Sequence, residues 1–183
     1  MNTSLKLAGL VLAVSMAYTG GAAALSTQSA RSEVVTQIAA VTPLSMRYFC
    51  AQNPRECRGG GAAQVTMTPN VMAVLNQVNT QVNRAIRPRV DRADVWTLNP
   101  AYGDCEDYVL SKRSALIRQG LPASSLRIAY THTRRGAPHA VLVVRSSQGD
   151  YVLDNLTNSV KTVRASGYRI RSMSSANPTQ WTG

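Results

Sequence analysis

The sequence predicts an α+β fold in which two helices precede an antiparallel sheet. Apolar residues recur every three or four positions between residues 68 and 119, as on one face of a helix. From residue 126 onward they alternate with polar residues, which is typical of strands. The composition agrees, because 44% hydrophobic residues in a chain of 183 can bury one core.

The first 24 residues predict a signal peptide, not a part of the fold. Lys6 precedes a short apolar run, and the small residues that follow end in Ala22-Ala23-Ala24. The run is shorter than the roughly 20 residues of a membrane span. We therefore expect one periplasmic or secreted domain over residues 25–183, with no stable membrane span after signal cleavage. An uncleaved N-terminal anchor is the alternative.

The helical half is predicted from periodicity and from helix start and stop signals. Residues 25–64 have weak periodicity and are expected to be irregular, the segment 25–45 included. A threonine followed by a proline begins the helix predicted over 68–86, and a glycine ends the helix predicted over 104–119. Residues 87–103, between the two helices, contain prolines and glycine and are expected to form a loop.

The sheet half is predicted from alternating residues separated by turn signals. Strands are expected over residues 126–133, 139–145 and 151–155, with turns rich in glycine, proline and serine between them. Residues 160–163 and 168–173 are candidates for two further strands.

Three cysteines in a compartment that permits disulfides leave one thiol over. Cys50 and Cys57 are close in sequence and outside the predicted helices, so we expect them to pair, which contributes about 2–3 kcal/mol. That leaves Cys105 as a free thiol at the first position of a helix, where the helix dipole favours a thiolate. The alternatives are that Cys105 pairs with one of the others, or that it is a buried structural cysteine.

The residues around Cys105 are acidic and oppose a thiolate. Asp104, Glu106 and Asp107 place negative charge beside the sulfur, so a nearby imidazolium or a bound cation is needed to lower its pKa. In the simpler interpretation, Asp104 caps the helix and the other two acids complement its dipole.

His139 and Asp154 are predicted on neighbouring strands. If residues 146–149 form the turn, the two side chains lie on one face of the sheet as a diagonal pair, with Cβ atoms roughly 7 Å apart. A register slip of one residue would place them on opposite faces, and a surface histidine with an exposed aspartate is the simpler interpretation. Together with Cys105, they supply a nucleophile, a base and an orienting acid.

Three motifs resemble the bacterial transglutaminase-like cysteine proteinases, in particular the LapG-like periplasmic proteases that release surface adhesins. They are GDCEDY around Cys105, HAVL from His139 and VLDNL around Asp154. The resemblance implies a papain-like or transglutaminase-like core with Cys105 as nucleophile, His139 as base and Asp154 as orienter. It also implies calcium, held by Asp104 and Glu106.

The chain carries 20 lysines and arginines against nine acidic residues, a net charge of +11. Arg134 and Arg135 lie next to His139, so a basic rim could attract an acidic protein substrate in the cell envelope. An ordinary solvated surface is the alternative. We expect no nucleic-acid partner, because a secreted chain without an aromatic-basic motif is a poor fit for one.

The function predicted from these residues is a secreted cysteine endopeptidase that works through a thioester acyl-enzyme. A transglutaminase or amidase would use the same triad and acyl-enzyme, and would differ in the group that accepts the acyl unit. A non-catalytic basic binding module is the alternative from a different class.

Overall fold

A computed structural model of the chain describes residues 39–90 and 93–183. The predicted signal peptide, residues 1–24, lies outside this part of the chain. The described residues belong to a unit that begins at Thr36. No helix among them combines the length and the hydropathy that crossing a lipid bilayer requires.

Within the described residues, the centre of the fold is a seven-stranded antiparallel sheet with the strand order β1-β9-β8-β4-β5-β6-β7. Its strands are β1 (Ala39–Ala40), β4 (Leu126–His132), β5 (Pro138–Val144), β6 (Tyr151–Asp154), β7 (Thr157–Thr162), β8 (Ser172–Ser174) and β9 (Trp181–Thr182). A short parallel ladder joins β2 (Arg87–Pro88) to β3 (Tyr102–Gly103) inside the predicted loop.

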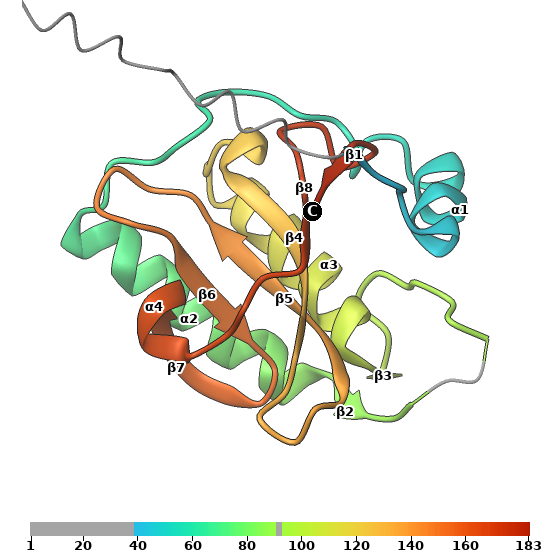
Figure 1. The fold of residues 1–183 in the computed structure, drawn as a ribbon. Coiled ribbons are helices and arrows are strands. Elements are labelled where there is room, and N and C mark those ends of the chain that lie inside the picture. The colour runs from blue at the N-terminus through green and yellow to red at the C-terminus, as the bar shows by residue number, and fades with distance from the viewer. Residues whose placement is uncertain (1–38, 91–92) are drawn as a thin grey trace, which may run out of the picture. The chain divides into compact units, whose positions relative to one another are not determined.

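Helices cover one face of this sheet. Figure 1 shows α2 (Pro69–Ala85) and α3 (Cys105–Arg118) packed together against it. The core between them is mainly aliphatic, with Leu75, Leu116 and Leu142 fully buried. The short helix α4 (Val163–Ser166) and the chain that follows it cover the opposite face of the sheet. This arrangement confirms the predicted α+β class.

The two predicted helices begin where the sequence signals indicate. Thr68 caps α2 by accepting a hydrogen bond from the Val71 N–H at 3.2 Å, and a proline fills the first helical position. Pro88, the first proline after the predicted helix, lies in β2, two residues after the C-cap Ile86. The α3 helix starts at Cys105, with Asp104 as its N-cap residue.

Strands β4, β5 and β6 agree with the predicted strands to within one residue at each end. Leu142 pairs with Leu153 and Val144 pairs with Tyr151, which is the register expected for a turn over residues 146–149. β7 includes most of the predicted segment 160–163, whereas only the end of the predicted segment 168–173 belongs to a strand, β8.

The expectation of irregular structure over residues 25–64 is wrong for residues 39–40 and 44–52, whereas residues 53–64 are irregular as expected. Residues 44–52 form the helix α1 (Leu44–Gln52), and β1 pairs with β9, so part of the segment 25–45 is regular as well. Only Met46 and Phe49 of α1 are buried. Two buried residues in nine are too few to give a periodic signal in the sequence. The helix is stabilised by its tertiary contacts.

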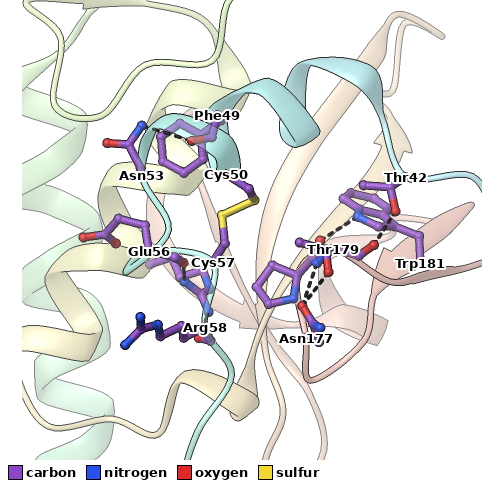
Figure 2. The surroundings of a disulfide bond; sticks show 12 residues. Thr42, Phe49, Cys50, Asn53, Glu56, Cys57, Arg58, Asn177, Thr179 and Trp181 are labelled. Carbon is purple, nitrogen blue, oxygen red and sulfur yellow. Dashed lines mark hydrogen bonds between the residues drawn. A yellow bond between two sulfur atoms is a disulfide. The ribbon is translucent and has the colours of Figure 1, made fainter.

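Cys50 and Cys57 form a disulfide, and the third cysteine is free. The bridge links the end of α1 to the loop that follows it, as Figure 2 shows. Arg113 of α3 fixes this loop, because its guanidinium donates hydrogen bonds to the carbonyl oxygens of Glu56 and, at 3.2 Å, of Arg58. The disulfide loop is therefore attached to the helix that begins with Cys105.

Candidate active site

Local sequence fixes the position of Cys105 at the start of α3. Asp104 and Asp107 form a capping box, in which the Asp104 N–H donates to Asp107 Oδ2 at 3.2 Å. Gly103 lies so close to this box that a Cβ added to it would be 2.8 Å from the Cβ of Asp107. A larger residue would displace the cap. Glycine at position 103 therefore allows the capping box to form, and the capping box fixes the position of Cys105.

Asp107 has a structural role at this helix end. It is buried, and its Oδ1 accepts a hydrogen bond from the Thr97 N–H at 2.7 Å. Because Oδ2 already accepts the Asp104 N–H, the carboxylate joins the preceding loop to the helix. The sequence predicts only a dipole interaction for Asp107, and its hydrogen bond to the preceding loop is an additional contact.

The surroundings of Cys105 keep its thiol protonated. The Sγ atom donates to Glu106 Oε2 at 3.1 Å. Burial, followed by the charge of Glu106, raises the pKa of the thiol well above its usual range, and a smaller effect of the Ala140 backbone N–H lowers it. Burial and a hydrogen bond with Asp104 raise the pKa of Glu106 to about 7. The acidic surroundings thus oppose the thiolate that a nucleophile requires.

His139 and Asp154 form a buried pair on neighbouring strands. The Nε2 atom of His139, on β5, lies 2.9 Å from Oδ1 of Asp154, at the end of β6. Burial would raise the pKa of Asp154, but hydrogen bonds from His139, the Leu156 N–H and Tyr168 outweigh it and hold the pKa below its ordinary value. Because the carboxylate is ionised, Nε2 carries a proton, and in the neutral form of the ring Nδ1 is then the acceptor.

The three residues predicted as a triad lie in one region of the fold. The backbone N–H of Ala140, the residue after His139, acts on the sulfur of Cys105, so β5 passes beside the first turn of α3. The thiol donates to Glu106, however, and not to the ring of His139. The His139–Asp154 contact is therefore formed, whereas the contact between Cys105 and His139 is not.

Tyr168 contacts both members of the buried pair. Its hydroxyl donates to Oδ2 of Asp154 at 2.5 Å, and its ring centroid lies 5.9 Å from that of His139. Sequence reasoning missed this residue, because a tyrosine at the start of a candidate strand carries no sign of a contact with an acid fourteen positions earlier. The structure identifies Tyr168 as a third support of the Asp154 carboxylate.

Two asparagines of α2 hold the turn that follows Asp154. The Nδ2 atom of Asn83 donates to the carbonyl oxygens of Asp154 at 3.0 Å and Thr157 at 3.2 Å. The Nδ2 atom of Asn79 donates to the same Thr157 oxygen at 2.9 Å. Four positions apart, both asparagines lie on one side of the helix, so α2 positions the acid end of the pair.

A cavity of about 530 Å³ opens beside Asp154 and Tyr168. Arg134, Arg135 and Lys161 contribute cations to its wall, together with apolar and hydroxyl side chains. None of the three forms an ion pair within residues 39–90 and 93–183. The arginines that the sequence places next to His139 therefore line a cavity at the site.

Asp104 and Glu106, the predicted calcium ligands, are in hydrogen-bond contact with each other. Carboxylate oxygens are the ligands that calcium prefers, but the ion takes about six to eight oxygens. In the part of the chain that the structure describes, no group of three or more acidic, histidine or cysteine side chains could hold a metal ion. The two acids fit calcium by type, and carbonyl oxygens and water would have to complete the ligand set.

A cysteine at a helix N-terminus, beside an antiparallel sheet with a buried histidine–aspartate pair, defines a transglutaminase-like α+β fold. Comparison with protein families agrees with this class. The chain belongs to the bacterial transglutaminase-like cysteine proteinase (BTLCP) family, whose profile matches residues 36–183.

Solved structures of LapG from Legionella pneumophila have a similar fold. Calcium-bound LapG matches with a TM-score of 0.53 and 24% identity, over 59% of this chain and 66% of that one. A second LapG structure matches with a TM-score of 0.54 and 23% identity, over 64% and 71%. This chain therefore spans just under two thirds of the length of the calcium-bound LapG chain. No curated protein sequence matches the chain.

Proposed function

We propose that the protein is a periplasmic or secreted cysteine endopeptidase with Cys105, His139 and Asp154 as its catalytic triad. The observation that carries this proposal is the buried 2.9 Å contact between His139 Nε2 and Asp154 Oδ1, next to a free cysteine at a helix N-terminus. Membership of a family of cysteine proteinases supports the same chemistry. Export follows from the signal peptide predicted over residues 1–24.

The proposed reaction proceeds through a thioester. Cys105 gives its proton to Nδ1 of His139 while Sγ attacks the carbonyl carbon of the peptide bond. Backbone N–H groups at the start of α3 stabilise the oxyanion. The imidazolium returns the proton to the leaving amine as the C–N bond breaks. Water, deprotonated by His139, then hydrolyses the thioester and restores the thiol.

Cys105 has to leave Glu106 before this sequence can start. In the structure its S–H points to the Glu106 carboxylate, and the surrounding charge keeps the thiol protonated. A rotation about the Cα–Cβ bond turns the S–H away from Glu106 and toward the free Nδ1 of His139. Positive charge near Asp104 and Glu106 favours this change, because it removes the interaction that holds the proton on sulfur.

Calcium is the cation that we propose for this position. Asp104 and Glu106 would hold it through hard carboxylate oxygens, with the remaining ligands from carbonyl groups and water. When bound, the ion supplies positive charge that offsets the repulsion between the acids and a thiolate. The support is the donor type of the two residues and the calcium-bound state of a LapG structure with the same fold.

The proposed substrate is an acidic segment of a protein in the cell envelope. Arg134, Arg135 and Lys161 line the cavity next to the histidine–aspartate pair, and none of them forms an ion pair with a described acid. Carboxylates of an extended substrate would pair with these cations while the cleaved bond lies over Cys105. A salt-dependent preference for acidic peptides is the expected consequence.

Mass spectrometry of new N-termini tests this function. Peptides from envelope proteins are incubated with the wild-type protein or with Cys105→Ala, in the presence of calcium. We expect new N-termini with the wild type alone, with aspartate and glutamate enriched near the cleaved bond. Isopeptide products in place of new N-termini would indicate acyl transfer to amines. Capture of acidic peptides by both proteins without cleavage would indicate a binding module.

A further inference from the structure

Lys112 is a buried cation that the proposed mechanism does not use. It lies on α3 and is 0% exposed. Its Nζ has no hydrogen-bond partner among the described residues and lies 5.6 Å from the ring centre of Tyr108. Lysine is almost never fully buried without a partner, because an ammonium loses its hydration there. The position of Lys112 therefore calls for a specific interaction.

Three asparagines in the same region have an acceptor that is not used. The Oδ1 atoms of Asn79, Asn83 and Asn155 are buried and have no partner within the described part of the chain. Because Nδ2 of the first two donates to carbonyl oxygens of the β6–β7 turn, their Oδ1 atoms lie on the side of the amide away from those carbonyls. The helix that carries Asn79 and Asn83 packs against the helix that carries Lys112 (Figure 1).

Asp154 is the acid whose charge acts on Lys112. Burial lowers the pKa of Lys112 to about 7, and the charge of Asp154 works in the opposite direction. The Asp154 carboxylate accepts its hydrogen bonds from His139, Tyr168 and the Leu156 N–H. Lys112 is thus near Asp154 but does not hydrogen-bond to it, and the unpartnered asparagine oxygens are buried acceptors that water can link to its N–H groups.

We propose that Lys112 is a positioning residue whose amino group binds the oxygens of Asn79, Asn83 and Asn155 through bridging water, and thereby fixes the turn that carries Asp154. The turn needs this support, because the register of β6 and β7 shifts between Val152 and Asp154. The inference rests on the proposed role of Asp154 as the orienter of His139.

Two substitutions separate the amino group from the rest of the side chain. Lys112→Met keeps the apolar stem and removes the amino group, whereas Lys112→Gln keeps hydrogen-bond donors. We expect kcat per titrated active-site thiol to fall roughly 10- to 100-fold in Lys112→Met, with KM changed less than about twofold. The kcat of Lys112→Gln should lie between those of Lys112→Met and the wild type. The thermal midpoint should change little, because the loss of the water-mediated contacts is offset by the removal of a buried amine whose ionised form has no charge partner in contact.

Arg113→Met is the matched control. Arg113 is the next residue of the same helix and is also a buried cation, but it binds the disulfide loop. This variant should have a lower thermal midpoint and an unchanged kcat per titrated thiol. If Lys112→Met does not fold, Asn155→Ala, which removes one acceptor, takes its place, and a smaller loss of kcat is expected.

A second measurement does not depend on turnover. In a Cys105→Ala background, the buried Nε2–H of His139 should give a slowly exchanging proton NMR signal. We expect Lys112→Met to broaden or abolish this signal, and Lys112→Gln and Arg113→Met to keep it. An unchanged signal, or a wild-type kcat, in Lys112→Met would overturn the inference. A protein that shows the signal change but cleaves no peptide would refute the proposed function and leave the positioning role standing.

Discussion

Asp154 accepts hydrogen bonds from His139, Tyr168 and the Leu156 N–H. Each donor favours the ionised carboxylate, and together they outweigh the effect of burial on its pKa. The ionised carboxylate in turn fixes the proton of His139 on Nε2. The acid–base part of the site is therefore preorganised, whereas Cys105, with its proton held by Glu106, is not.

Tyr168→Phe should impair the orienting carboxylate without disturbing the fold. The change removes one hydrogen bond to a charged group, worth about 1.5 kcal/mol, so kcat/KM should fall roughly tenfold. The pKa of Asp154 should rise, which moves the acid limb of the profile of kcat/KM against pH to higher pH. Tyr151→Phe is the control, because the Tyr151 hydroxyl has no hydrogen-bond partner in the described residues. Identical pH profiles for both variants would contradict the role of Tyr168.

The buried Lys112 should make stability depend on pH. Its pKa is about 7 when folded and is lowered from 10.5. Between these two pH values the unfolded chain binds the extra proton, so this residue's contribution to stability rises with pH and is lost as pH falls toward 7. The raised pKa values of Cys105 and the tyrosines make stability fall with pH. Their contributions cancel when the wild type is compared with a variant at Lys112.

Urea unfolding of the wild type and Lys112→Met from pH 7 to 9.5 measures this linkage. The variant should be relatively most stable at pH 7, and the difference in unfolding free energy should change by at most about 1.4 kcal/mol per pH unit. A difference that is constant over this range would show that Lys112 does not titrate as the structure indicates.

Helix α3 connects the candidate site to the disulfide loop. Its first residue is Cys105, and two turns later Arg113 donates to the carbonyl oxygens of Glu56 and Arg58. The disulfide closes the loop that contains Glu56. It therefore restrains the part of α3 around Arg113 and not the sulfur of Cys105. Its contribution should appear in stability more than in reactivity.

Replacing both Cys50 and Cys57 by alanine tests this separation. The loop-entropy relation predicts a loss of about 2–3 kcal/mol in unfolding free energy, measured in urea. The alkylation rate of Cys105 under native conditions should stay within about twofold of the wild type, since no contact at the sulfur changes. A strong change in that rate with little loss of stability would contradict the assignment.

Helices α2 and α3 and strands β4 to β6 could be predicted because each has a periodic apolar face and a local start or stop signal. The register of His139 and Asp154 could be predicted because the turn length fixes it. The helix α1 could not, since only two of its residues are buried. The contacts of Tyr168 and Lys112 depend on how distant segments pack, and no local pattern marks them.

The whole molecule combines a basic surface with one acidic cluster. The net charge is +11, yet three of the nine acidic residues, Asp104, Glu106 and Asp107, lie within four positions at the start of α3. A divalent cation is therefore attracted to one helix end of a molecule that otherwise repels cations. The proposed calcium ion and the proposed acidic substrate would bind at different places for this reason.

Calcium should bind to Asp104 and Glu106 and increase the reactivity of Cys105. Calorimetry on chelator-washed protein should detect binding to the wild type, and calcium should raise the thermal midpoint and the alkylation rate of Cys105. Glu106→Gln should weaken all three effects and keep the helix cap, since Asp107 supplies the cap contacts. Absence of binding heat, together with an alkylation rate unchanged by chelator, would rule calcium out.

The proposed acyl-enzyme can be observed directly by mass spectrometry. A peptide found to be cleaved is mixed with the protein, the reaction is quenched in acid, and the adduct is mapped. We expect the N-terminal product, less one water, on Cys105 of the wild type. No adduct should form in Cys105→Ala, almost none in His139→Ala, and a reduced amount in Asp154→Asn. Cleavage by Cys105→Ala at the wild-type rate, or an adduct on another residue, would contradict the triad.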